Sequence, residues 1–254
     1  MATIRTIFAG IGAAGAAGAA VVTGLTMRHA DEDPGALTLI ADPETEICLR
    51  TDLKFFAGAK RGCVDKAEIG RWRTAPVLDD RGAPVELNMS HPTDFQRDFE
   101  AVKSCGQYRR REGDGWYAGS TREMRREAFF ERACGVISFL LDARAPSETF
   151  FQDGALTIAD VRSLGEGPPF RIAPSADAVD AVMDAAAAED GVWGLSSGEQ
   201  YARIQEIAHA DFNGDGAGDI LTFVTVGVEG ATASAGTVGF LEKTSADAPV
   251  RFKQ

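Results

Sequence analysis

The sequence has few histidines, few cysteines and a shortage of positive charge. Its 254 residues include three His and four Cys, and 26 Lys and Arg stand against 38 Asp and Glu, for a net charge of -12. A chain this acidic repels phosphate backbones, which argues against nucleic-acid binding. Repeated long apolar runs are absent, which excludes a membrane protein with several spans. With 44% hydrophobic and 25% charged residues, the composition is that of a folded chain of one or two domains.

The common catalytic and nucleotide-binding motifs are also missing. There is no serine in a GxSxG elbow and no glycine-rich phosphate loop of the P-loop or Rossmann type. No two cysteines are close in sequence, which argues against tetrahedral zinc. Carboxylate pairs of the glycoside-hydrolase kind stay open, because such pairs are distant in sequence. We identify no catalytic residue, and the sequence leans towards a protein without enzymatic activity.

The first 30 residues predict export. From Ile7 to Met27, 21 residues carry no charge, and Arg5 and Arg28 flank them. A basic residue before an apolar stretch, with the acids of 31–33 after it, favours an N-in, C-out orientation. Everything after about residue 30 is therefore expected outside the cytoplasm, in the periplasm or the extracellular space.

This segment has two interpretations. A cleaved signal peptide fits the small residues at 17–20, although a cut after Ala30 would put Arg28 where a small residue is expected. A retained anchor fits the length, since 21 residues at about 1.5 Å each span a bilayer core of roughly 30 Å. Spaced small residues such as Ala14 and Gly18 would let another helix approach closely. The anchor would then bind an integral membrane complex.

Cysteine usage agrees with export. The four cysteines are an even number without a CxxC pair, and they permit three disulfide pairings. We favour the local pairs, Cys48–Cys63 and Cys105–Cys134, each contributing about 3 kcal/mol. The alternative is four free buried thiols in a cytosolic protein.

The first half of the chain predicts short strands followed by helices. Strands are expected at 37–40 and 46–50, and loops with short strands from Phe55 to Pro92. A capping pattern at Thr93 predicts a helix towards Cys105. The clearest helix begins after Ser120, where Glu123 completes a capping box, and continues to about Ala143. A loop is expected over 109–119, between the two helices.

The second half predicts a helix pair followed by strands. A short helix capped by Thr157 comes first, then a Gly/Pro linker, then an alanine-rich helix over 176–190. Strands are expected at 201–210, 220–228 and 237–244.

These elements predict the α+β fold class. Helices lie in the middle of the chain, antiparallel β hairpins lie at its C-terminal end, and an N-terminal signal or anchor helix precedes them. The predicted domains are 1–30, the signal peptide or anchor, and 31–254, an extracytoplasmic domain that could divide near 165–175.

Charge is shared unevenly between the two halves of that domain. Residues 31–144 carry 18 basic and 21 acidic side chains, whereas residues 145–254 carry 6 and 17. An acidic second half suits a cation site, although solubility alone would also explain it.

One loop in this half carries a chemical signal. The segment from Asp211 to Asp219 reads DFNGDGAGD and places oxygen-bearing side chains at its positions 1, 3, 5 and 9. Calcium takes six to eight oxygen ligands, and alternate side chains of a tightly curled loop converge on one point. The predicted ligands are Asp211, Asn213, Asp215, the carbonyl of Ala217, and Asp219. The lack of His and Cys disfavours zinc and copper.

The loop resembles the FG-GAP type of calcium loop found in integrin-like β-propeller repeats, in which a DxNxDGxxD hairpin binds the ion. An EF-hand would instead need a glutamate at position 12, where this chain has Thr222, and helices on both sides. The resemblance covers about 30 residues in a single copy, so it implies the hairpin site and not a propeller. It also implies that Asp219 ligates the ion directly.

The sequence thus predicts a non-catalytic, calcium-binding accessory or scaffold protein outside the cytoplasm, with a protein partner and two disulfides. One alternative is a secreted or periplasmic hydrolase acting on glycan or peptidoglycan. Another is a ligand-binding module that uses Trp116 and Tyr117 as an aromatic surface.

Overall fold

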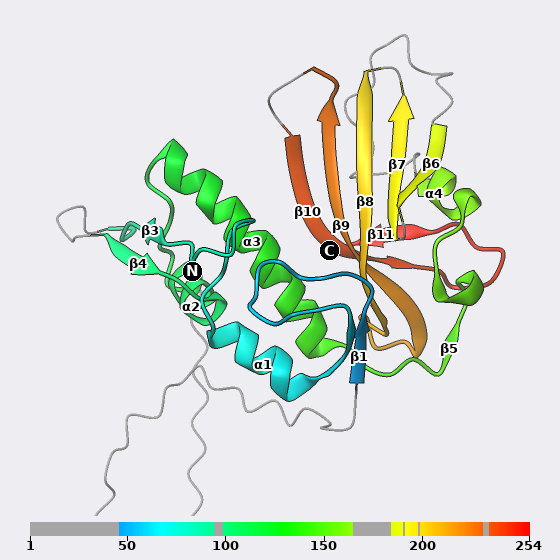
Figure 1. Ribbon diagram of the computed structural model, residues 1–254, viewed down its shortest axis with the longest axis horizontal. Coiled ribbons are helices and arrows are strands. Elements are labelled where there is room, and N and C mark those ends of the chain that lie inside the picture. Colours follow the sequence, from blue (N-terminus) through cyan, green and yellow to red (C-terminus); the bar gives the residue numbers. More distant parts are fainter. Residues whose placement is uncertain (1–45, 94–98, 165–183, 190, 198, 231–233) are drawn as a thin grey trace, which may run out of the picture. The chain divides into compact units, whose positions relative to one another are not determined.

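A strongly twisted β-sheet is the main structural element among the residues described from Glu46 onwards (Figure 1). The structure is a computed structural model, and it describes residues 46–93, 99–164, 184–189, 191–197, 199–230 and 234–254. The strands are β1 (Glu46–Leu49), β2 (Gly62–Asp65), β3 (Leu87–Met89), β4 (Glu100–Val102), β5 (Glu148–Thr149), β6 (Asp184–Glu189), β7 (Val192–Ser197), β8 (Gln200–Ala210), β9 (Ala217–Val228), β10 (Ser234–Glu242) and β11 (Arg251–Lys253). The helices are α1 (Lys66–Thr74), α2 (Cys105–Gly113), α3 (Thr121–Asp142), α4 (Ile158–Leu164) and the short 3-10 turn η1 (Gln152–Gly154).

Strand β8 is the centre of the sheet. The strands β11, β10, β9, β8, β1 and β2 follow one another across it, all antiparallel. While β9 pairs along one side of β8, the other side pairs with β7 over its first half and with β1 over its second half. A register irregularity between Glu206 and Ala208 separates the two halves. Strand β6 pairs with β7, β5 pairs in parallel with β9, and β3 and β4 form a separate two-stranded sheet.

Each face of the sheet supports its own hydrophobic core. Successive side chains of a strand point to opposite faces, so Leu221 of β9 belongs to one core and its neighbour Ile220 to the other. The first core includes buried residues of α1, α2 and α3, such as Phe130. The second core includes Val161 of α4.

The α+β class predicted from the sequence is wrong. The described residues form mostly antiparallel β-sheet, nine strands of it in one sheet, with four α-helices. Strand pairing continues through both halves of the chain and is not confined to C-terminal hairpins, because β1 and β2 extend the sheet that β8 and β9 begin.

The alanine-rich helix expected over 176–190 is wrong where the structure describes it. Residues Asp184–Glu189 are strand β6, whose register pairs Ala185 with Leu195 and Ala187 with Trp193. Alanine favours helix only as a weak prior, and pairing with a neighbouring strand overrides it here.

Three other expectations also fail locally. The helix expected from Thr93 towards Cys105 is replaced by strand β4 over Glu100–Val102. The first half of the loop expected over 109–119 belongs to α2, which Ser104 caps by accepting a hydrogen bond from Gln107 N at 3.3 Å. Within the expected loops of 55–92 lies α1, capped by Asp65 through Glu68 N at 2.6 Å.

Several local predictions are confirmed. Helix α3 follows Ser120, whose hydroxyl accepts from Glu123 N at 3.2 Å, and it ends at Asp142. Thr157 precedes α4, and its hydroxyl accepts from Asp160 N at 3.2 Å. Strands β1, β8, β9 and β10 lie where alternating apolar residues predicted them.

Three predictions concern residues that the structure does not describe. The signal or anchor helix within 1–30, the strand at 37–40 and the subdivision near 165–175 lie outside the described residues. In the part of the chain that is described, no helix has the length and apolarity needed to cross a membrane.

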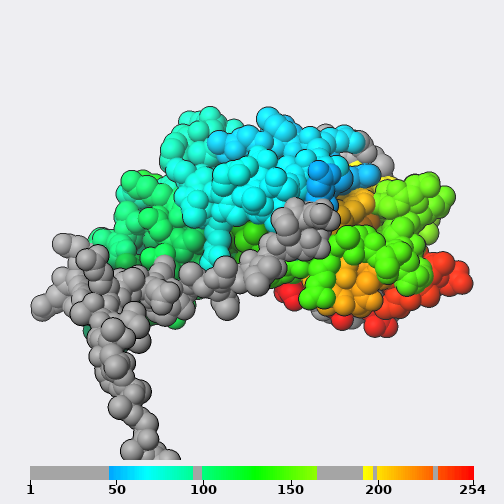
Figure 2. Space-filling model, turned by 90° about the horizontal axis from the view of Figure 1, so that it is seen from below, coloured from blue at the N-terminus to red at the C-terminus, as the bar shows by residue number. Residues whose placement is uncertain are grey.

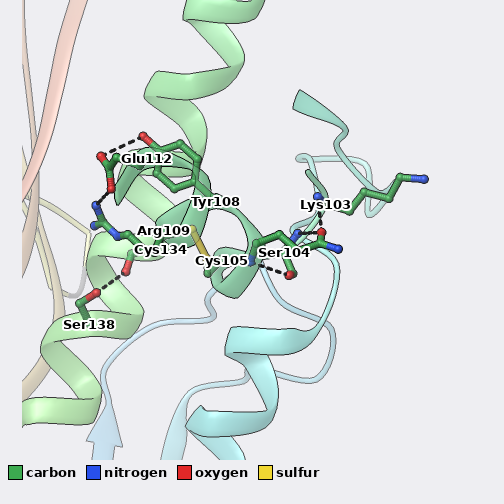
Figure 3. Close-up of a disulfide and its surroundings, with 9 residues drawn as sticks. Lys103, Ser104, Cys105, Tyr108, Arg109, Glu112, Cys134 and Ser138 are labelled. Carbon is green, nitrogen blue, oxygen red and sulfur yellow. Dashed lines mark hydrogen bonds and ion pairs between the residues drawn. A yellow bond between two sulfur atoms is a disulfide. The ribbon is translucent and has the colours of Figure 1, made fainter. Parts of the chain in front are cut away.

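The structure forms both favoured disulfides, Cys48–Cys63 and Cys105–Cys134. The second joins the first turn of α2 to α3, and hydrogen bonds surround it (Figure 3). Ser138 Oγ donates to the Cys134 carbonyl at 3.0 Å, and Tyr108 Oη donates to Glu112 Oε1 at 3.3 Å. Two disulfides indicate an oxidising environment, extracellular or periplasmic.

Candidate functional site

The predicted calcium loop is the connection between β8 and β9. The β8–β9 ladder continues down to the pair Ala210–Asp219, so residues 211–218 form the closing turn and its first strand residues. Gly214 and Gly216 have φ of 80° and 88°, a left-handed backbone that glycine adopts without a Cβ penalty. The turn therefore reverses tightly enough to bring Asp211 and Asp219 to its base.

The two aspartates at the base are buried and bind backbone amides. Asp211 is 3% exposed; its Oδ1 accepts from Gly214 N at 2.6 Å and its Oδ2 from Gly216 N at 3.0 Å. Asp219 is 2% exposed, and its Oδ2 accepts from Phe212 N at 3.0 Å. These bonds fix both ends of the loop.

Two of the other predicted ligands, Asn213 and Asp215, lie exposed at the tip, whereas Ala217 is buried. Asn213 Oδ1 accepts from Asp215 N at 2.9 Å, and Asn213 Nδ2 donates to Asp215 Oδ2 at 3.0 Å. Asp215 Oδ1 accepts from Ala217 N at 2.8 Å. Ala217 is already the first residue of β9, in register with Glu148 of β5.

The environment of Asp219 disfavours its charge. Burial is the largest cause, and the nearby charges of Asp215, Asp211 and Glu242 add to it, while the bond from Phe212 N opposes it. Together they raise the pKa of the Asp219 carboxyl to about 7. A positive charge beside this carboxylate would relieve the repulsion among the loop aspartates.

Arg144 and Ser147, which no sequence motif singles out, contact the loop and hold it in place. Ser147 Oγ donates to the Gly216 carbonyl at 2.9 Å, and its backbone N–H donates to the same oxygen at 2.8 Å. A Cβ built on Gly214 would lie 3.2 Å from Arg144 Nη1, so the Arg144 guanidinium packs on the turn. Ser147 and Gly216 are 69 residues apart, and no local sequence pattern links them.

The donor chemistry of the loop fits a hard cation. Three carboxylates, one side-chain amide and a backbone carbonyl are the ligand types that calcium takes. In the structure, however, the side chains form a hydrogen-bonded turn, and across the described residues no three His, Cys, Asp or Glu side chains gather in the manner of a metal site. Ion binding would require the exposed Asn213 and Asp215 to turn towards the base of the loop.

A second polar cluster lies on β8, close to this loop. Glu206 is 2% exposed; its Oε1 accepts from Trp193 Nε1 at 2.9 Å, and its Oε2 lies 3.1 Å from His209 Nε2. Burial raises the pKa of Glu206, but the bonds from His209 and Trp193 outweigh it, so that the pKa lies below its usual value. The cluster occupies the register irregularity of β8 and satisfies a buried carboxylate there.

Trp116 and Tyr117, the two aromatic residues of the predicted ligand-binding module, lie in different environments. Trp116 is 8% exposed, with Arg111 Cζ 4.9 Å from its ring centroid and the His91 ring 5.1 Å away. Tyr117 is exposed. A pocket of about 260 Å³ lies near the start of α3 and is lined by Asn88, Phe99, Gly119, Ser120, Arg122 and Glu123. Tyr117 does not line it, so the pair and the pocket do not form one surface.

Comparison with protein-family models, with curated proteins and with solved structures found no match. The chemistry of the site is therefore taken from its own residues.

Proposed function

We propose that this chain is a non-catalytic, calcium-binding accessory or scaffold protein that works outside the cytoplasm. The observation that carries the proposal is the β8–β9 turn, which brings the carboxylates of Asp211, Asp215 and Asp219 and the amide of Asn213 into one short loop. The two disulfides support a location outside the cytoplasm.

The proposed role of calcium is structural. An ion at the turn would bind the folded chain in preference to the unfolded chain, and so would stabilise it. The turn connects the two longest strands of the sheet and is braced by β5, so rigidity there would pass directly into the sheet. A single hairpin loop without paired helical lobes has no groove to expose, which fits a structural ion better than a switch.

The proposal extends to the N-terminal segment. An uncharged stretch of 21 residues between arginines, rich in glycine and alanine, suits a helix that packs against membrane-spanning protein. The chain would then be an N-in, C-out subunit of a larger membrane assembly.

Titration calorimetry and thermal melting of the full-length chain with calcium test the metal site. We expect binding heat and a rise in Tm, which at calcium a hundredfold above Kd corresponds to about 2.7 kcal/mol. Asp215→Asn keeps an oxygen that can accept from Ala217 N but removes one charge, so it should weaken binding severalfold. Asp247→Asn, a change at an exposed aspartate near the C-terminus, is the matched control and should bind like the wild type.

The absence of both heat and Tm shift in the wild type would refute the calcium site. So would an identical calcium response in Asp215→Asn and Asp247→Asn. The membrane part is tested separately, by the size of the native protein after mild solubilisation and by sequencing its N-terminus. A protein that migrates without partners and lacks residues 1–30 would refute the anchored subunit. The calcium site would not be affected by that result.

A further inference from the structure

The two disulfides lie in contrasting surroundings. Cys105 and Cys134 are each 1% exposed, in the core between α2 and α3. Cys48 and Cys63 both lie at exposed positions, on β1 and β2. The stretch that contains β1, β2 and α1, blue to cyan in Figure 2, lies at the surface of the molecule. A thiol in solution can therefore reach Cys48–Cys63 without any unfolding.

The exposed pair lies at the end of the sheet. Cys48 is directly opposite Cys63 in the β1–β2 register, and on its other side it is directly opposite His209 of β8. Side chains of directly paired residues point to the same face. Across this face the order is therefore Cys63, Cys48, His209, and β2 is the last strand of the sheet that the described residues form.

This order makes the two sulfur atoms unequal. A thiolate attacks a disulfide in line with the S–S bond, from the side opposite the sulfur that leaves. An attack on Cys48 would come from the side of His209, whose ring is fixed by Glu206 at 3.1 Å. A Cβ built on Gly154 would lie 3.5 Å from His209 Nδ1, so the η1 turn packs on the same ring. An attack on Cys63 comes from beyond the terminal strand.

The strands that carry this disulfide are held by other contacts. Ile47 and Leu49 of β1 are buried in the first core, and Arg50 N donates to the Ile207 carbonyl at 2.8 Å. Inside the loop that the disulfide closes, Leu53 N donates to the Ala59 carbonyl at 2.8 Å, and both residues are buried. Opening the bond therefore leaves both thiols in register, ready to pair again.

We propose that Cys48–Cys63 is a reversible thiol–disulfide exchange site of the folded protein, attacked at Cys63 by a dithiol. In the first step the thiolate of the dithiol bonds to Cys63 Sγ. The Sγ–Sγ bond breaks, and its electron pair goes to Cys48 Sγ, which takes a proton from water. In the second step the other thiolate of the dithiol attacks its own bound sulfur and releases Cys63 Sγ, which is protonated in turn. The pair gains two electrons and two protons, and the dithiol becomes a disulfide.

The exchange is tested on the oxidised full-length chain with dithiothreitol, without denaturant. Free thiols are alkylated at intervals and located by peptide mass spectrometry, while circular dichroism follows the fold. We expect Cys48 and Cys63 to open at least about tenfold faster than Cys105 and Cys134, with the sheet signal unchanged, and to pair again when the reductant is removed. Opening of both disulfides at one rate, or opening only with loss of the sheet signal, would overturn the proposal.

The site of attack is tested with glutathione, a monothiol that cannot carry out the second step, and the adduct is trapped by rapid alkylation of the released cysteine before the two cysteines pair again. In the wild type we expect most of the adduct on Cys63, and a majority on Cys48 would overturn the assignment. His209→Ala clears the opposite approach and should spread the adduct over both cysteines, whereas His91→Ala, on a distant loop, should keep it on Cys63. An adduct confined to Cys63 in a folded His209→Ala protein would contradict the role of the ring. If that variant does not fold, the adduct position in the wild type decides.

Discussion

Arg144 and Asp211 exchange two backbone hydrogen bonds, from Arg144 N to the Asp211 carbonyl at 2.9 Å and from Asp211 N to the Arg144 carbonyl at 3.0 Å. This bridge ties the end of the helical segment to the β8–β9 turn. It also sets the Arg144 guanidinium against Gly214. The shape of the candidate cation loop thus depends on a residue that has no place in the loop motif.

Gly214→Ala should lower the stability of the protein more than Gly58→Ala, a change at a glycine with nearly the same φ. At Gly214, with φ 80°, an added Cβ meets Arg144 Nη1 at 3.2 Å; at Gly58, with φ 79°, it meets nothing within 4 Å. Both variants should lose about 1 kcal/mol for the left-handed backbone, and Gly214→Ala about 1 kcal/mol more for the contact. Urea unfolding of the two proteins measures the difference, and equal losses would show that Arg144 does not pack on the turn.

The ion pair of Lys243 with Asp160 should be required for stability at neutral pH. Lys243 Nζ lies 3.0 Å from Asp160 Oδ1, and the two side chains are 11% and 8% exposed. Lys243→Met leaves a buried carboxylate without its cation, so we expect a loss of roughly 3 kcal/mol. The double variant Lys243→Met, Asp160→Asn should recover much of that loss, and a double variant no better than Lys243→Met would argue against the pair.

The same carboxylate predicts an acid dependence. Burial raises the pKa of Asp160, but hydrogen bonds from Thr157 and Lys243 and the charge of Lys243 outweigh it, so that the pKa lies below its usual value. A lowered pKa means that the unfolded chain binds the proton first, so this stabilisation is present above about pH 4 and is lost as the pH falls through the folded-state pKa. Urea unfolding from about pH 7 to pH 2 should show a smaller acid loss in Asp160→Asn than in the wild type.

Tyr108 should ionise at a higher pH than an exposed tyrosine. Its side chain is buried, and burial together with the charges of Glu112, Glu131 and Glu127 raises its pKa well above the usual tyrosine value. Because the folded state holds the proton more tightly, the stability contributed by this group is lost as the pH rises above about 10. An alkaline titration of tyrosinate absorbance should contain a late phase that Tyr108→Phe lacks and that Tyr117→Phe keeps. A late phase that persists in Tyr108→Phe would assign it elsewhere.

The buried disulfide should contribute more stability than the exposed one. Cys105–Cys134 lies inside the first core and joins residues 29 positions apart in sequence. Cys48–Cys63 lies at the surface and joins residues 15 positions apart. We expect Cys105→Ala, Cys134→Ala to lose about 4 kcal/mol and Cys48→Ser, Cys63→Ser about 3 kcal/mol. Thermal unfolding measures both, and the reverse order would mean that the exposed bond holds the sheet together.

The sequence predicted the elements whose signals are local. The capping-box pattern of Ser120 and Glu123 spans only four residues, and α3 begins there. The favoured disulfides and the β8–β9 turn also join residues that are near one another in sequence. Such contacts are favoured because closing a short loop costs little entropy.

The sequence did not predict what depends on distant partners. Residues 184–189 have the propensity of a helix, and pairing with the neighbouring strand β7 makes them strand β6. Ser147 and Arg144 carry no motif, and their contact with the turn depends on how β5 lies beside β9. The fold class was wrong for the same reason, since the pairing of β1 with β8 leaves no trace in either strand alone.

The double pairing of β8 has a consequence for export. Thr51 and Gln205 hydrogen-bond across 154 residues, beside the junction of β1 and β8. A chain that emerges from its N-terminus forms the β1–β2 hairpin early, but β8, which pairs with the free edge of β1, follows about 150 residues later. Until then β1 has an unpaired edge and the first core lacks one wall, so the emerging half is prone to aggregation. Non-local pairing of this kind also slows folding, so the emerging half keeps this exposed edge for longer.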